Sequence, residues 1–171
     1  MADMTVEARL KAIEDVRAIE TLKWRYLRAC DRKQPDLVRS CFTDDAVIDF
    51  EGFPLFEDPD AFVAIYREWG CRPNIVDMHH GQNPLVELTG PDSAQGWFDL
   101  FFFQIDTETR RHTQLAVNYD DSFVRVDGRW LIARSVSRRM SMLVRDVGPD
   151  GVEKVMVAAR SDRDGPAPPP R

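Results

Sequence analysis

The sequence is poor in cysteine and has no long apolar run. Its 171 residues include three cysteines, Cys30, Cys41 and Cys71, which form no CxxC spacing and are odd in number. Structural disulfides and a zinc site are therefore poor expectations, and a reducing compartment is the natural one. No apolar run reaches membrane-spanning length, and the charged N-terminal segment lacks the apolar core of a signal peptide. We expect a cytoplasmic protein with no membrane partner.

The sequence also lacks a basic run. Its net charge is -6, and Arg32-Lys33 and Arg138-Arg139 are isolated pairs. Binding nucleic acid requires a basic face that neutralises phosphates, so no nucleic-acid partner is expected. The length and the ten Phe and four Trp suit one globular domain with a real core. We expect residues 1–159 to form this domain and the Pro-rich tail 160–171 to be disordered.

The first half of the chain predicts three helices. Pro35 begins a short second helix, Asp58-Pro59 caps a third that runs through Trp69, and Asp31 lies at the junction of the first two. The third helix has a predicted buried stripe of Phe62, Ile65, Tyr66 and Trp69. The first helix spans Thr5 to Cys30, and its three- and four-residue apolar steps predict a stripe of Leu10, Ile13, Val16, Ile19, Leu22, Tyr26 and Cys30.

From residue 70 onward the pattern changes to period two and predicts an antiparallel sheet. Before it, Thr43–Asp45 is expected to be a turn that precedes a short strand, 46–50. Helices followed by long strands define an α+β fold, in which a bent sheet closed by helices encloses a cone-shaped pocket. The predicted strands of the second half are 75–80, 84–88, 93–105, 113–126 and 130–144.

Both faces of strand 93–105 are apolar. Phe98, Leu100, Phe102 and Gln104 share one face, and Trp97, Asp99, Phe101 and Phe103 share the other. One face should be covered by the helices and the pocket. The other would be covered by a second subunit, giving a homo-oligomer through the sheet, or by packing within the chain. Periodicity alone leaves open which set faces the cavity.

Two of the three histidines lie in the stretch Asp77-Met78-His79-His80-Gly81-Gln82-Asn83. Neighbouring side chains on a strand point to opposite faces, so His79 shares a face with Asp77, and His80 lies opposite. Adjacent histidines on opposite faces do not converge on one ion, so no metal site is expected. The plainer interpretation is that both are ordinary polar residues at a strand end. His112 is expected to be solvated near a turn.

Several landmarks resemble SnoaL-like proteins of the NTF2-like superfamily, which have a cystatin-like fold. They are the run from Ile19 to Tyr26, Cys30-Asp31, the run from Phe42 to Val47, His79-His80-Gly81-Gln82-Asn83 and the run from Val126 to Trp130. The resemblance extends over roughly residues 6–145, nearly the whole chain, as the fold length would require. It implies an α+β cone in which three N-terminal helices pack on a strongly curved, mainly antiparallel sheet, commonly as a dimer.

Within that superfamily the chain is most similar to scytalone dehydratase, bile-acid 7α-dehydratase and hexachlorocyclohexane dehydrochlorinase. These lyases need no cofactor and use a pocket histidine paired with an aspartate. The resemblance places these roles on His79 and Asp31, and a further polar position on Tyr26. It implies that a small hydrophobic molecule binds in the cone, against Phe50, Asp77, Leu100, Phe102, Gln104, Val117, Tyr119, Ser135, Ser137 and Arg139.

The chain departs from these relatives at two positions. Gln104 stands where scytalone dehydratase has a second pocket histidine. Ser135 stands where the dehydrochlorinase has a pocket arginine, which leaves Arg139 as the nearest cation on that face. Asp99 would become a second pocket acid if the register shifted by one residue, although its apolar neighbours argue against this.

The residues suit an elimination. Histidine changes charge near neutral pH, so His79 can accept a proton from carbon while Asp31 orients the ring and stabilises the imidazolium. Tyr26 would donate to an oxygen or pack in the core. We therefore expect a cofactor-free lyase, most simply a dehydratase acting on a steroid- or polyketide-like ring. The alternatives are a non-catalytic binding or assembly subunit, like the β subunit of ring-hydroxylating oxygenases, and an isomerase, cyclase or epoxide hydrolase on the same scaffold.

Overall fold

The computed structural model describes residues 5–158. Thr5 caps the first helix, because its Oγ1 accepts a hydrogen bond from the backbone N–H of Ala8 at 3.2 Å. Asp58 caps the third in the same way through Asp60. The helices are α1 (Val6–Asp31), α2 (Pro35–Arg39), α3 (Pro59–Ile65) and a π-helical turn, η1 (Tyr66–Gly70).

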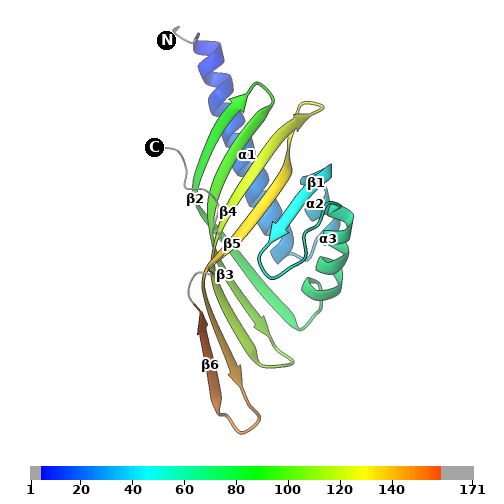
Figure 1. Cartoon of the computed structure of the whole chain (residues 1–171), viewed down its shortest axis with the longest axis vertical. Helices are drawn as coiled ribbons and strands as arrows, with labels where there is room; N and C mark the ends of the chain where they lie inside the picture. Colours follow the sequence, from blue (N-terminus) through cyan, green and yellow to red (C-terminus); the bar gives the residue numbers. More distant parts are fainter. Residues whose placement is uncertain (1–4, 159–171) are drawn as a thin grey trace.

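One six-stranded sheet forms most of the rest of the described residues (Figure 1). The strands lie in the order β1-β5-β4-β3-β2, and β6 pairs with the far end of β5. All pairings are antiparallel except that of β1 with β5. The strands are β1 (Phe42–Phe50), β2 (Ile75–Gly90), β3 (Ser93–Asp106), β4 (Arg111–Val126), β5 (Arg129–Val147) and β6 (Glu153–Ala158).

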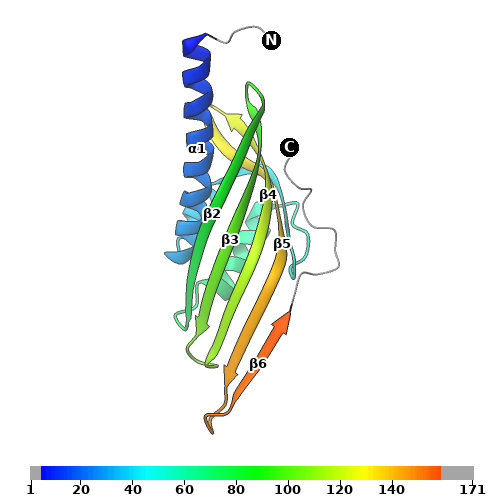
Figure 2. The same ribbon diagram turned by 90° about the vertical axis from the view of Figure 1, so that its left-hand side faces the viewer.

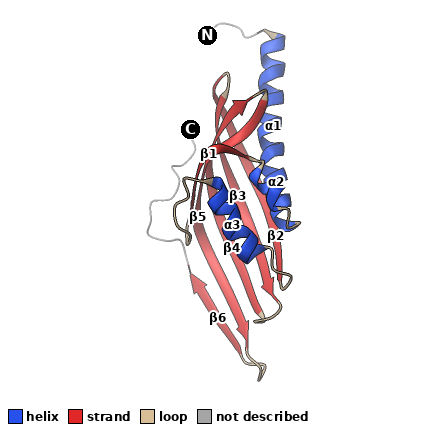
Figure 3. Cartoon of the chain, turned by 90° about the vertical axis from the view of Figure 1, so that its right-hand side faces the viewer, coloured by secondary structure: helices blue, strands red, loops and turns tan. Residues whose placement is uncertain are grey.

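The sheet is long and curled, and its concave face is covered by helices. Figure 2 shows α1 running alongside β2, and Figure 3 shows α3 on the side of the sheet that carries α2. The predicted α+β cone with a mainly antiparallel sheet is thus confirmed. The face that carries Phe98 and Leu100 is the buried one, whereas Phe101 on the opposite face is 42% exposed.

The N-terminal half of α1 does not bury the predicted stripe. Leu10 and Ile13 are 54% and 66% exposed, and the buried side chain at this level is Asp15. Asp15 pairs with Arg125 of β4 at 2.6 Å and accepts a hydrogen bond from Trp130 of β5 at 3.3 Å. The ion pair and the hydrogen bond of Asp15 therefore determine which face of α1 packs on the sheet at this level. The C-terminal half buries Ile19, Leu22, Leu27 and Cys30 with the sheet, largely as the apolar pattern predicts.

Three further expectations are wrong in detail. Thr43–Asp45 belong to β1, where a register shift follows Phe42, instead of forming a turn. The two strands predicted over 75–88 are one strand, β2, interrupted by a bulge in which Asn83 has a positive φ of 50°. The third helix becomes a π-helix after Ile65, which turns Trp69 outward, where it is 53% exposed.

The last strand was not anticipated. β6 pairs with Arg145 and its neighbours in β5 across a turn at 148–151, and its strand signal is the short run Val155-Met156-Val157. Among the described residues no helix is long and apolar enough to cross a membrane. The segment 160–171, expected to be disordered, lies outside the described residues.

Candidate active site

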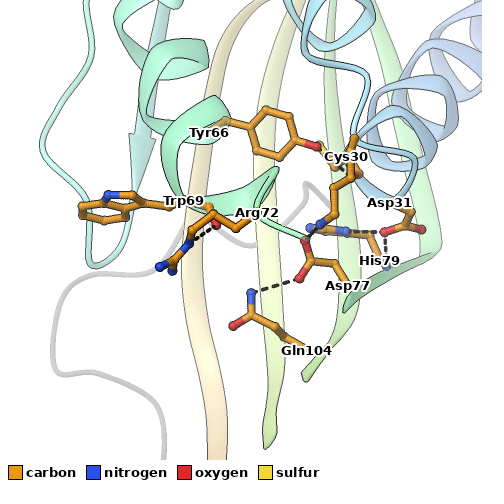
Figure 4. A network of polar contacts seen from close by, with 9 residues as sticks. Cys30, Asp31, Tyr66, Trp69, Arg72, Asp77, His79 and Gln104 are labelled. Atoms are coloured by element: carbon orange, nitrogen blue, oxygen red, sulfur yellow. Dashed lines mark hydrogen bonds and ion pairs between the residues drawn. The ribbon is translucent and has the colours of Figure 1, made fainter. Parts of the chain in front are cut away.

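His79 and Asp31 form a bonded pair where the end of α1 meets β2 (Figure 4). Asp31 Oδ1 lies 2.6 Å from Nδ1 of His79 and accepts a hydrogen bond from the backbone N–H of His79 at 2.9 Å. Because a carboxylate is an acceptor, Nδ1 carries the shared proton. The second ring nitrogen, Nε2, has no protein partner in the part of the chain that the structure describes, so it is free to accept a proton.

The close approach of α1 to β2 depends on Gly81. A Cβ at this position would lie 2.2 Å from Trp24 Cζ3 and 2.6 Å from Leu27 Cδ1, both on α1. The missing side chain therefore lets α1 lie against β2. Asp31, the last residue of α1, is thereby brought within hydrogen-bonding distance of His79, two residues before Gly81. The His79-His80-Gly81 run thus contains both the candidate base and the glycine whose close packing against α1 brings Asp31 to it.

A second polar bridge lies beside the first. Asp77, two residues before His79 on β2, forms an ion pair with Lys33, two residues after Asp31. The other oxygen of Asp77 accepts a hydrogen bond from Gln104 Nε2 at 2.9 Å. Asp77 and Gln104 therefore lie on the face of His79, as expected, and Figure 4 shows them beside it. The sequence analysis missed Lys33, because Arg32-Lys33 was interpreted as an isolated basic pair at the surface.

The predicted binding residues share one face of the sheet but differ in exposure. Phe102 lies opposite His79, with ring centroids 4.7 Å apart, and is half-buried like Gln104 and Arg139, whereas the Asp77 side chain is only 5% exposed. Arg139 is paired with Glu51 at 3.0 Å. The other six are packed in the core, each at most 9% exposed: Phe50, Leu100, Val117, Tyr119, Ser135 and Ser137. Of the predicted binding residues near the dyad, Phe102 and Gln104 are thus only partly buried.

The core also holds a buried ion pair that the sequence analysis missed. Lys23 Nζ lies 2.7 Å from Asp121 Oδ2, and both side chains are fully buried. Ser135 donates to the other Asp121 oxygen at 2.6 Å, and the ammonium lies 3.4 Å from the centre of the Tyr119 ring. Burial lowers the pKa of Lys23 and raises the pKa of Asp121, and the attraction between them opposes both changes. The sequence did contain one signal of this buried charge, which is a lysine at position 23 among the apolar residues of the first helix.

Tyr26 is a core residue in this structure. Its side chain is 3% exposed, its ring packs edge-on against Phe42, and burial raises its pKa well above the usual value. Its expected role as a proton donor therefore stays a prediction. Tyr66 is the better placed hydroxyl: it is half-buried and donates to the carbonyl of Cys30 at 2.7 Å, one residue before Asp31.

The remaining polar candidates lie away from the concave face. His80 is exposed, and the Asp99 carboxylate accepts hydrogen bonds from Asn83 and Asn118 on the convex face, so the shifted register is wrong. His112 is not solvated as expected, because β4 begins at Arg111 and places its ring 4.5 Å from that of Phe103. Among residues 5–158 no group of three or more His, Cys, Asp or Glu side chains could hold a metal ion.

The dyad also borders an open groove of about 510 Å³ on the outer side of α1 and β2. Arg25, Arg28 and Trp24 of α1 line it on one side, and His80 of β2 lines it on the other. Asp31 and His79 can therefore be approached from this groove.

The chain belongs to the SnoaL-like domain family, whose model matches residues 11–136. No curated protein matches it in sequence. The fold is shared with solved structures of low identity. One is a scytalone dehydratase-like protein from Novosphingobium aromaticivorans, with a TM-score of 0.71 and 21% identity over 77% of this chain and 87% of that one.

Two further structures have the same fold. A hexachlorocyclohexane dehydrochlorinase of type 3 from Novosphingobium barchaimii has a TM-score of 0.68 and 20% identity, over 94% of this chain and 99% of its own. A Novosphingobium aromaticivorans protein named as an aromatic ring hydroxylase has a TM-score of 0.67 and 22% identity, over 73% and 88% of the two chains. At these identities the likeness establishes the fold, and the scaffold is one that includes lyases.

Proposed function

We propose that this protein is a cofactor-independent dehydratase that removes water from a hydrophobic cyclic molecule of the steroid or polyketide type. The observation that carries the proposal is the His79–Asp31 pair, because Asp31 occupies Nδ1 and leaves Nε2 as a free base. The dehydratase and dehydrochlorinase names of two structural neighbours support an elimination on this scaffold.

The reaction follows from this geometry. Nε2 of His79 takes a proton from the carbon next to a substrate carbonyl, and the C–H electron pair moves onto the carbonyl oxygen as an enolate. The enolate collapses to a C=C bond as the C–O bond of the β-hydroxyl breaks. The proton held on His79 passes to the leaving hydroxyl and completes a water molecule. Asp31 holds the ring in one tautomer and stabilises the imidazolium.

The half-buried residues beside the dyad are proposed to contact the substrate. Phe102 offers an aromatic face 4.7 Å from the His79 ring, which suits a flat apolar ring system. Gln104 has a side-chain amide that is fixed by Asp77, so its carbonyl oxygen can accept from a substrate hydroxyl.

The test is elimination from a panel of hydroxylated steroids and cyclic β-hydroxyketones. We expect wild-type protein to release water from at least one compound, and His79→Ala and Asp31→Asn to lower kcat by about 10²–10⁴-fold. His112→Ala is the matched control, because the His112 ring packs against Phe103 on the opposite face of the sheet and does not line the groove beside the dyad, and it should keep full activity.

Each contrary outcome has a distinct meaning. Equal turnover by wild type and His79→Ala would reject His79 as the base. Tight binding without turnover, or a stable hetero-oligomer on purification, would favour the non-catalytic subunit. A rearranged or cyclised product of unchanged mass would identify an isomerase or cyclase.

A further inference from the structure

The end of α1 and the middle of β2 are joined by two adjacent polar bridges. Asp31 bonds to His79, and Lys33 pairs with Asp77. Asp31 and Lys33, two residues apart, thus pair with His79 and Asp77, which are also two residues apart. Since Asp77 and His79 share the same face of β2, the Lys33 ammonium is held on the same side of the strand as the proposed base.

The backbone at Lys33 adopts a conformation that favours glycine. Its φ is 55°, just past the end of α1, and its N–H donates to the Cys30 carbonyl at 3.1 Å. For a residue with a Cβ this conformation is uncommon and costly, and such costs are often found at functional sites. The turn at this position directs the Lys33 side chain back toward β2, although glycine would adopt this backbone conformation at a lower energetic cost.

The Lys33 ammonium is partly satisfied and partly accessible. One Asp77 oxygen takes one of its three N–H donors, and about a quarter of the side chain (24%) stays exposed. Asp77 itself is almost fully buried at 5% and is also held by Gln104, so it fixes the position of the ammonium. The charged groups that face Lys33 are therefore Asp77 and, one bridge away, Asp31. Arg139, the cation expected from sequence, is paired with Glu51 at 3.0 Å and lies on β5.

We propose that Lys33 is the oxyanion donor of this site: it hydrogen-bonds to the carbonyl oxygen of the substrate as negative charge develops there. This inference rests on the proposed elimination and assigns the group that stabilises its enolate. His79 removes the proton from carbon, the electron pair moves to the carbonyl oxygen, and a Lys33 N–H donates to that oxygen without transferring its proton. Removal of such a donor typically lowers kcat by about 10²–10³-fold.

The closing experiment uses 4-nitrophenol, a ring that becomes a coloured oxyanion and needs no turnover. Its ionised fraction when bound is read from the absorbance of the phenolate across a pH series. If Lys33 donates to the oxygen, wild-type protein should lower the pKa of the bound phenol by about one unit, a tenfold change in the ionised-to-neutral ratio. Lys33→Gly should abolish the shift, and Lys33→Arg should keep most of it.

The glycine substitutions are chosen to suit the positive φ at each mutated position. Lys33→Gly removes the ammonium without straining the positive φ, but it leaves Asp77 with only the hydrogen bond from Gln104. The double variant Lys33→Gly/Asp77→Asn, which also removes that carboxylate charge, should likewise lack the shift and is the test variant if the single one does not fold. Arg110→Gly is the control, because Arg110 is an exposed cation with a φ of 57° in the β3–β4 turn, and it should leave the phenol shift intact.

The outcomes separate this inference from the proposed function. A shift that persists in Lys33→Gly, or a phenol that stays neutral when bound or does not bind to wild type, overturns the role of Lys33 even if His79 proves essential for elimination. A Lys33-dependent shift that survives His79→Ala supports the oxyanion site even if no elimination is found.

Discussion

At the scale of single residues, the least expected side chain is Lys23, because it is fully buried in the middle of α1. Its charge is balanced by Asp121 and by the face of the Tyr119 ring, while Ser135 satisfies the second carboxylate oxygen. Such a network is stable only when every member is present, because removal of one partner leaves an unpaired charge in the core.

We expect Lys23→Met to lower the free energy of unfolding by about 3–5 kcal/mol, since Asp121 would lose its counter-ion in a fully buried position. Adding Asp121→Asn to the same chain should recover part of this loss, because the unpaired charge is then absent. Urea denaturation of the three proteins measures both values. A loss below about 1 kcal/mol for Lys23→Met would mean that water reaches the pair.

At the scale of elements, the turn between β3 and β4 is organised by Asp106. Its Oδ1 accepts hydrogen bonds from the Asn74 side chain at 2.8 Å and from the backbone N–H groups of Glu108 and Thr109 at 3.0 and 3.3 Å. These bonds, led by that from Asn74, lower the pKa of Asp106 to about 2. The carboxylate thus connects the start of β2 with the end of the hairpin.

This pKa predicts a loss of stability in acid. The folded-state value lies below the ordinary 3.8 of an aspartate, so the ionised group stabilises the fold at pH above 3.8, and this contribution disappears as the pH falls toward 2. In Asp106→Asn, which keeps an acceptor oxygen without a proton to gain, the urea midpoint should fall less steeply between pH 4 and 2 than in wild type. Parallel slopes for the two proteins would contradict the assignment.

At the scale of the whole molecule, the convex face of the sheet exposes apolar side chains that a soluble monomer would normally cover. Val76, Met78 and Phe101 are 51%, 48% and 42% exposed. They lie on neighbouring strands on the face opposite the site, since Met78 and His80 pair with Phe103 and Phe101. We propose, as the sequence suggests, that this face forms the contact between two copies of the chain.

The mass in solution tests this proposal. Phe101→Asp should convert a dimer into a monomer in sedimentation velocity at micromolar concentration, because it places a charge in the apolar contact. Leu10→Asp, at a position on α1 that is 54% exposed, should leave the mass unchanged. A wild-type monomer, or a dimer that survives Phe101→Asp, would contradict the sheet-face contact.

Local patterns predicted most of the helices and strands, and the resemblance to SnoaL-like proteins is what placed Asp31 beside His79. The strand alternation that places His79 with Asp77 and Phe102 with Gln104 holds in the structure, and Asp31 does lie next to His79. The patterns failed where long-range polar contacts decide the outcome. Asp15, in place of the apolar residues around it, faces the sheet because Arg125 and Trp130 are there to receive it. No periodicity in α1 contains that information.

The sequence by itself determined the α+β class, the long first helix, the main strands and the histidine face, because each depends on spacing along one segment. Tertiary structure alone decided the pairing of Lys33 with Asp77 and of Lys23 with Asp121. These contacts join residues 44 and 98 positions apart. Their formation depends on how closely α1 approaches the curled sheet, a distance that is set at Gly81 by the absence of a side chain.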